Sequence, residues 1–246
     1  MNKLSFPLLA FLFVFNLSVQ AKDAATVSRY FDPDTVDYKA LLPEPPANNS
    51  ATTKQEINFI LQKQATWTYA ERERCRRAVN LNVYLFDTVL GSWFTAENVH
   101  ATDALFKKVD DTVRPVTDAA KKHWHRPRPF LVDSRIHPPF PIIDDDVQPP
   151  FDLSKSPAYP SGHSTVGNLD GLILAQLAPD LKEALNARGL QIGDDRVIAG
   201  VHFPSDVAAG HILARALFRK LMANAAFQTD LAKAKKEIAA ERAKVH

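Results

Sequence analysis

Helical periodicity dominates the pattern of hydrophobic and polar positions along the chain. Apolar residues recur at helical intervals from Thr53, with breaks, as far as Gly91, a residue type that commonly ends helices. Thr53 and Glu56 have the spacing of a capping box, which predicts a helix start at Thr53. A second apolar face, including Leu105 and Val109, predicts a helix over about 95–124.

Within this second helix we expect a kink or break at Pro115. Residues 126–160 follow and are rich in proline, with neither a helix nor a strand period. They predict a long loop, and such loops inside compact domains are more often functional than idle.

Helical periodicity resumes at Ser161 and extends to the C-terminal region. It predicts a core helix over 163–180, a short amphipathic helix that stops at Gly189, a helix over 205–223 and a charged helix over 224–244. Strand-like alternation is scarce throughout. The fold class expected is all-α, a single-domain helical bundle with its loops, including the long Pro-rich one, gathered at one end.

The first residues predict an export signal. Lys3 precedes an almost continuous apolar run over 4–19, and small residues up to Ala21 suit cleavage there. The run is short for a membrane anchor and is interrupted by Pro7 and Asn16. The expected organisation is a signal peptide over 1–21, an extended Pro-rich arm over 22–52 and the all-α domain over 53–246.

Composition narrows the possible partners and the compartment. Removal of residues 1–21 takes one of the 30 basic residues and none of the 28 acidic ones, so the formal charge becomes 29 − 28 = +1. No overall field would recruit nucleic acid or an anionic membrane, and no later segment is long and apolar enough to span one. Cys75 is the single cysteine, which excludes intramolecular disulfides and Cys-rich zinc motifs and favours a bacterial periplasmic or secreted protein.

Three stretches carry residues with complementary chemistry. The first holds Lys121 and Arg128, and the proline after Arg128 restricts the backbone that aims its guanidinium. The second is Pro160-Ser161-Gly162-His163 at a helix start, where free backbone N–H groups bind anions. Together these cations and amides would suit a tetrahedral oxyanion.

The third stretch holds Arg196, His202 and Asp206. A turn at Phe203 and Pro204 would let the Asp206 carboxylate accept from one imidazole nitrogen of His202 and leave the other nitrogen unprotonated, as a nucleophile requires. His163 would then be available as an acid.

Each stretch also has a structural interpretation. A lysine at a helix C-terminus complements the helix dipole, Arg-Pro pairs are ordinary in loops, and a His-Asp pair four residues apart is often a surface hydrogen bond. The combination favours a catalytic site, because a structural protein has no evident need for an oxyanion pocket with two histidines.

Other motifs are absent or have simpler explanations. The chain has no Gly-x-Ser-x-Gly elbow and no Walker-type phosphate loop. Alternating charges over 71–77 indicate a salt-bridged helix face, and Cys75 within them is expected to be buried and inert. His123 and His125 lack the helical spacing of a zinc hydrolase, so no catalytic metal is expected.

The three stretches resemble the three-part motif of the type 2 phosphatidic-acid phosphatase and vanadium haloperoxidase superfamily. The parts occur in the same order, with 30 residues between Pro129 and Pro160 and 31 between His163 and Asp195. The export signal, the size and the flanking sequences "HRPRPF" and "GVHFPSDVAAG" are similar to the class A bacterial non-specific acid phosphatases.

The resemblance implies a metal-independent acid phosphatase that needs no cofactor. His202 would attack phosphorus and form a phosphohistidine, Asp206 would hold its ring, and His163 would protonate the leaving alkoxide. The phosphate oxygens would be bound by five residues: Lys121, Arg128, Ser161, Gly162 and Arg196. Small phosphorylated molecules would be the substrates, with nucleotides, sugar phosphates, phytate and lipid headgroups all open, and a homodimer is possible.

The third part departs from the family at one position. The family usually has a serine that helps to bind phosphate where this chain has Asp195. A carboxylate there would repel a dianion unless it turns away or pairs with an arginine. Two alternatives to a phosphatase therefore stay open, a vanadate-dependent haloperoxidase and a non-catalytic phosphate-binding protein.

Overall fold

The computed structural model describes residues 28–144 and 151–245, and the predicted signal peptide lies outside these ranges. The described chain is almost entirely helical, as expected, and its only strands are two that pair antiparallel, with Ile143 opposite Asp152. The helices and strands are α1 (Tyr38–Leu41), α2 (Ala51–Thr66), α3 (Tyr69–Arg77), α4 (Asp87–Leu90), α5 (His100–Trp124), α6 (Pro129–Val132), β1 (Ile143–Asp144), β2 (Phe151–Asp152), α7 (Gly162–Leu177), α8 (Lys182–Ile198), α9 (Pro204–Met222) and α10 (Ala225–Ala243), with 3-10 turns at Pro33–Thr35, Val83–Phe86, Leu153–Lys155 and Pro179–Leu181.

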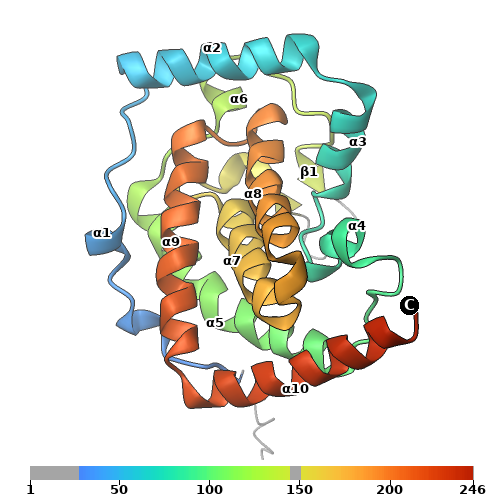
Figure 1. Cartoon of the computed structure of the whole chain (residues 1–246). Coiled ribbons are helices and arrows are strands. Elements are labelled where there is room, and N and C mark those ends of the chain that lie inside the picture. The colour runs from blue at the N-terminus through green and yellow to red at the C-terminus, as the bar shows by residue number, and fades with distance from the viewer. Residues whose placement is uncertain (1–27, 145–150, 246) are drawn as a thin grey trace, which may run out of the picture.

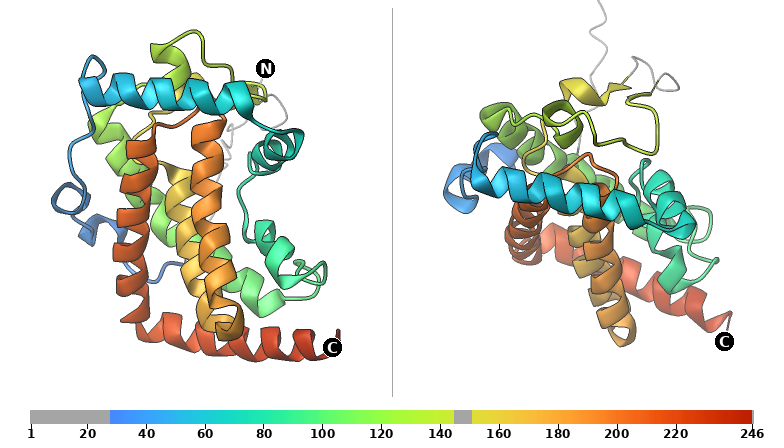
Figure 2. Two further views of the ribbon diagram at one scale, coloured as in Figure 1. Left: turned by 45° about the horizontal axis from the view of Figure 1, so that its top comes forward. Right: turned by 90° about the horizontal axis from the view of Figure 1, so that it is seen from above.

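Helices α7, α8 and α9 form the centre of the bundle (Figure 1). Helix α7 packs most extensively against the other two, and α5 covers a further side of it. Helix α2 crosses one end of these helices, and α10 crosses the opposite end, as both views in Figure 2 show. The predicted site residues all come from the end that α2 crosses, where α5 and α8 finish and α7 and α9 begin.

Glycines allow α7 and α8 to approach closely. A Cβ added at Gly189 of α8 would lie 2.6 Å from the Gly167 carbonyl oxygen of α7. A Cβ at Gly171 of α7 would lie 2.8 Å from the Leu185 carbonyl oxygen. The prediction that Gly189 ends a helix is therefore wrong: α8 continues to Ile198, because the glycine serves a helix crossing and not a turn.

Helix α5 also continues where a break was expected. Pro115 lies inside its 25 residues, but the buried stripe of Val109, Val113 and Val116 continues on both sides of the proline. Packing of this stripe against the core outweighs the cost of one proline. The helix ends at His125, whose φ of 50° is left-handed.

The segments before α5 contain more separate helices than predicted. Helix α2 starts at Ala51 because Ser50 is its N-cap, so Thr53 is the residue that receives the cap and not the cap itself. Helicity stops at Thr66 and restarts at Tyr69. The described part of the arm contains α1 and is not simply extended.

The Pro-rich stretch between α5 and α7 contains α6 and the short β1–β2 pair. Arg128 N-caps α6, and Pro129 occupies its first turn. Within the described ranges, no helix is long and apolar enough to cross a bilayer.

The crossing of α7 and α8 yields a stability prediction. Gly189→Ala should lower the free energy of unfolding by about 1–3 kcal/mol, because the added methyl must push two helix backbones apart. Thermal or urea unfolding would measure the loss. Ala187→Ser, at an exposed position of the same helix, is the matched control and should change stability little. Equal stability of the two variants would contradict a close crossing at Gly189.

Candidate active site

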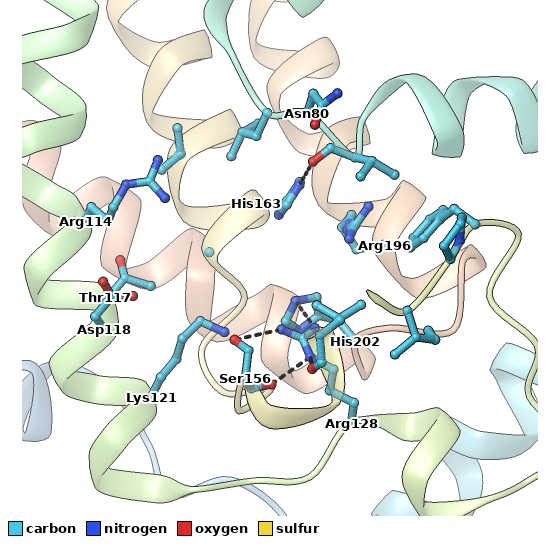
Figure 3. A pocket seen from close by; sticks show the side chains of 18 residues that line it. Asn80, Arg114, Thr117, Asp118, Lys121, Arg128, Ser156, His163, Arg196 and His202 are labelled. Carbon is cyan, nitrogen blue, oxygen red and sulfur yellow. Dashed lines mark hydrogen bonds between the residues drawn. The ribbon is translucent and has the colours of Figure 1, made fainter. Parts of the chain in front are cut away.

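Residues from four helix ends and two loops converge on one cavity of about 250 Å³ (Figure 3). Its lining includes six of the eight predicted site residues: Lys121, Arg128, Gly162, His163, Arg196 and His202. His163 and His202 lie on opposite sides of the opening, with Arg196 and Lys121 beside them. The other two predicted residues, Ser161 and Asp206, are fully buried behind this lining.

His202 lies in the connection between α8 and α9 and is only 2% exposed. Its Nε2 lies 3.0 Å from Nη1 of Arg128, and its Nδ1 lies 3.5 Å from Oδ2 of Asp206. A guanidinium can only donate, so Nε2 must be the unprotonated nitrogen and Nδ1 must carry the proton. Burial and the nearby cations hold the pKa of His202 well below its usual range, which keeps the ring neutral.

Asp206 is held at both of its carboxylate oxygens. Its Oδ2 accepts a hydrogen bond from the Phe203 amide at 2.8 Å, and its Oδ1 accepts one from Arg126 at 2.6 Å. Two arginines lie in "HRPRPF", and the resemblance selects Arg128 for phosphate binding and gives Arg126 no role. Arg128 lines the cavity, and Arg126 lies behind it with Asp206.

His163 belongs to the first turn of α7. Its Nε2 lies 3.3 Å from the carbonyl oxygen of Val79, a residue that the sequence gave no reason to select. Burial, together with Arg196 and Arg128, holds the pKa of His163 well below its usual range. The imidazole is therefore neutral when no anion lies between it and these guanidinium groups.

Lys121, Arg128 and Arg196 differ in how many of their donor groups form hydrogen bonds with the protein. Arg128 donates to the carbonyl oxygens of Leu153, Ser156 and Val201 at 2.8–3.1 Å. Lys121 donates to the Pro157 carbonyl oxygen at 2.5 Å.

Arg196 is 2% exposed, and within residues 28–144 and 151–245 both its Nε and its Nη1 lack a hydrogen-bond partner. Its guanidinium lies 5.1 Å from the centre of the Phe140 ring. Buried polar groups are normally satisfied, so these two free donors indicate that a ligand with acceptor oxygens belongs in the cavity.

Ser161 occupies a different position from the one predicted. Its hydroxyl accepts from the Ser164 amide at 3.3 Å and so caps α7, and its own amide donates to the Asp206 carbonyl oxygen at 3.0 Å. The side chain therefore orients the first turn of α7 toward the cavity. Gly162, the next residue, is the one that lines it.

Asp195, which departs from the family, turns away from the cavity. Arg74 of α3 donates to both of its carboxylate oxygens, at 2.7 and 3.0 Å, and Arg188 lies 3.7 Å away. The carboxylate is fully buried and paired on the far side of α8 from the cavity lining. Among the described residues it forms ion pairs with Arg74 and Arg188 and not with Arg196, although burial lowers the pKa of the Arg196 guanidinium and the charge of this carboxylate still opposes that decrease.

The remaining walls are contributed by the turn after α3, by α5, by one residue of α7 and by the Pro-rich stretch, and only the Pro-rich stretch was expected from the sequence to be functional. Their residues are Val79, Asn80, Leu81, Arg114, Thr117, Asp118, Phe140, Pro141, Ile142, Leu153, Ser156 and Val166. The apolar members surround the space beyond the histidines. No group of three or more His, Cys, Asp or Glu side chains among the described residues is arranged to hold a metal ion.

Comparison with known proteins gives consistent matches. The PAP2 superfamily pattern matches residues 112–229. The non-specific acid phosphatase of Salmonella typhimurium is 28% identical over 222 residues, which cover 87% of this chain and 86% of the relative. The acid phosphatase of Zymomonas mobilis is 36% identical over 143 residues, 58% of this chain and 50% of the relative.

A solved transmembrane PAP2-type phosphatidylglycerolphosphate phosphatase from Bacillus subtilis is more distant. It is 18% identical with a TM-score of 0.45, and the match covers 70% of this chain and 85% of the other.

The cavity's charge predicts pH-dependent anion binding. Burial and the neighbouring Arg128 lower the pKa of Lys121 to about 7, so the free protein loses this charge as the pH rises through that value. Sulfate stays a dianion over this range, and its affinity should fall by up to about tenfold per pH unit above pH 7. Titration calorimetry between pH 6 and 8.5 would measure it.

Two matched variants test whether the charge of Lys121 causes this pH dependence. Lys121→Arg keeps its charge at all these pH values and should flatten the decline above pH 7, whereas Lys122→Arg at the exposed neighbouring position should not. The two histidines contribute equally in both variants. An undiminished slope in Lys121→Arg would show that another group causes the dependence.

Proposed function

This chain belongs to the PAP2 superfamily and is a phosphoric monoester hydrolase of the acid phosphatase type, and we propose that it works through a phosphohistidine on His202, without a metal ion. The observation that carries this proposal is the placement of His202. Its Nε2 lines the cavity with an electron pair that accepts from Nη1 of Arg128 at 3.0 Å, and its Nδ1 lies 3.5 Å from Oδ2 of the buried Asp206.

The first chemical step uses that electron pair. Nε2 of His202 forms a bond to phosphorus while the bond from phosphorus to the ester oxygen breaks. The ring keeps its Nδ1 proton and becomes positively charged, next to Asp206. His163, on the opposite side of the cavity, supplies the proton that the departing alkoxide needs.

Hydrolysis of the intermediate reverses these roles. His163, now neutral, accepts a proton from water, and the water oxygen bonds to phosphorus as the bond from phosphorus to Nε2 breaks. Inorganic phosphate leaves, and both imidazoles return to their starting state.

Lys121, Arg128 and Arg196 stabilise the negative charge on the non-bridging oxygens. Two of them are arginines, whose planar forks suit phosphate, and the free donors of Arg196 need no rearrangement to bind it. Three cations around one phosphoryl group supply the charge neutralisation that phosphoryl transfer requires.

The substrate's own charge prepares the acid. In the free protein the pKa of His163 is held down by burial and by Arg196 and Arg128. A phosphate dianion placed among these groups offsets both arginines and raises the pKa of His163. The acid thus becomes protonated when substrate binds, which favours a bell-shaped pH profile.

The position of Asp195 supports catalysis over simple phosphate binding. The carboxylate is paired with Arg74 and Arg188, which offsets its repulsion of a dianion beside Arg196. Small phosphomonoesters are the proposed substrates, with the leaving group against Leu81, Val166 and Phe140. The pattern over 1–21 supports export to the periplasm or medium, and a homodimer stays a prediction.

The nucleophile can be tested by trapping. Acid quench destroys a phosphoramidate, so ³²P-labelled substrate should leave label on the protein after quenching in alkali and lose it in acid. His202→Ala should trap no label and lose about 10³-fold or more in kcat. Full activity in this variant, or an acid-stable label, would exclude His202 as the nucleophile.

The role of His163 as proton donor can be tested with two substrates whose leaving groups differ in their need for a proton. His163→Asn should lower kcat/KM, which reports the steps up to release of the leaving group, by about 10²–10⁴-fold for an alkyl phosphate, which needs a proton on its alkoxide. The loss should be much smaller for p-nitrophenyl phosphate, whose phenolate leaves unprotonated. Equal losses for both substrates would assign His163 to binding instead of proton donation.

A further inference from the structure

Arg126 lies outside the cavity and yet contacts the segment that carries the nucleophile more closely than any lining residue. It is only 3% exposed. Its Nη1 donates to Oδ1 of Asp206 at 2.6 Å and to the Ser205 hydroxyl at 2.7 Å. Its guanidinium carbon lies 4.0 Å from the centre of the Phe203 ring. Three of four consecutive residues, 203, 205 and 206, are thus fixed by one side chain.

Glu56 of α2 holds Arg126 from the other side. Its Oε2 accepts from Nη2 of Arg126 at 3.1 Å, and its Oε1 accepts from the Ser205 amide at 2.6 Å. One buried carboxylate therefore fixes both the arginine and the first turn of α9. This explains why α2 crosses the end of the bundle where the site lies (Figure 1).

The two oxygens of Asp206 have separate tasks. Oδ1 is occupied by Arg126, whereas Oδ2 accepts from the Phe203 amide and faces Nδ1 of His202. Without Arg126, the carboxylate could rotate about its bond and present either oxygen to the imidazole. A carboxylate fixed at one oxygen fixes the ring that its other oxygen faces.

We propose that Arg126 and Glu56 are positioning residues for the phosphatase reaction, which act by holding Asp206 Oδ2 against Nδ1 of His202. The two carboxylates and the single guanidinium of this group carry one net negative charge. That charge lies beside the imidazole which becomes positive when Nε2 bonds to phosphorus. The inference rests on the proposed roles of His202 and Asp206.

The ionisable groups around Asp206 determine the direction in which its pKa should change when Arg126 is removed. Arg126 and Glu56 contact it or its segment from behind; Lys121, Arg128, Tyr159 and His202 lie on its other sides. Burial raises the pKa of Asp206, and Arg126 opposes that rise. Removal of Arg126 should raise the pKa further, so ionisation of Asp206 would require a higher pH.

The first experiment is the pH profile of kcat for Arg126→Gln, with Arg126→Lys as the conservative variant. Arg126→Gln should lower kcat by about tenfold to a hundredfold and move the acid limb to higher pH. Arg126→Lys should restore part of both effects. Arg135→Gln, which removes an exposed ion pair with Asp133, is the matched control and should change neither. A lower kcat with an unmoved acid limb would overturn the proposal.

A double-mutant cycle separates this inference from the proposed function. In an Asp206→Asn protein, Arg126→Gln and Glu56→Gln should cost little further activity, because the group through which they act is already neutral. Additive losses would overturn the positioning role. Full activity of Asp206→Asn alone would instead overturn the proposed function. Glu56→Gln keeps the shape of α2, so it serves as the test if Arg126→Gln does not fold.

Discussion

The burial of three cationic side chains that form no ion pair within the described part of the chain is the constraint on which this structure depends. Lys121, Arg128 and Arg196 surround one small cavity, and their mutual repulsion and desolvation disfavour the empty state. The same groups are therefore ready for an anion before it arrives. Catalysis of phosphoryl transfer needs this kind of preorganised charge, and the rest of the fold has to supply the stability that the site lacks.

The fold supplies that stability where backbones meet most closely. The glycine crossing of α7 and α8 fixes His163 relative to Arg196, since each lies on one of these two helices. The Ser161 amide, bonded to the Asp206 carbonyl oxygen, joins the start of α7 to the start of α9. Main-chain contacts thus fix the helices that carry His163 and Arg196, whereas Arg128 and His202 come from the connections that follow α5 and α8.

Much of this arrangement could be predicted from sequence because the proposed site residues occur in motifs with fixed spacing. Periodicity identified the helical fold, and six predicted residues line one cavity. Local patterns predicted the wrong helix ends where tertiary contacts determine the helix. Helix α5 continues through Pro115 because its buried stripe packs against the core, and α8 continues through Gly189, which allows the close contact with α7. Arg126, Glu56 and Val79 could not be selected, because their roles depend on partners 70–84 residues away. From sequence alone, Asp195 would be expected to repel a phosphate dianion, because no local pattern shows that Arg74 pairs with this carboxylate.

The start of α5 has a consequence for biosynthesis. Its first turn has no local cap, and the amides of Ala101 and Thr102 donate to Glu237 of α10 at 2.9 and 2.8 Å, across 136 and 135 residues. The ribosome therefore releases the helix that carries Lys121 long before the acceptor for its N-terminus exists. The two amides stay hydrated until the segment that carries Glu237 has been made, so the first turn of α5 can be completed only when that segment folds against it.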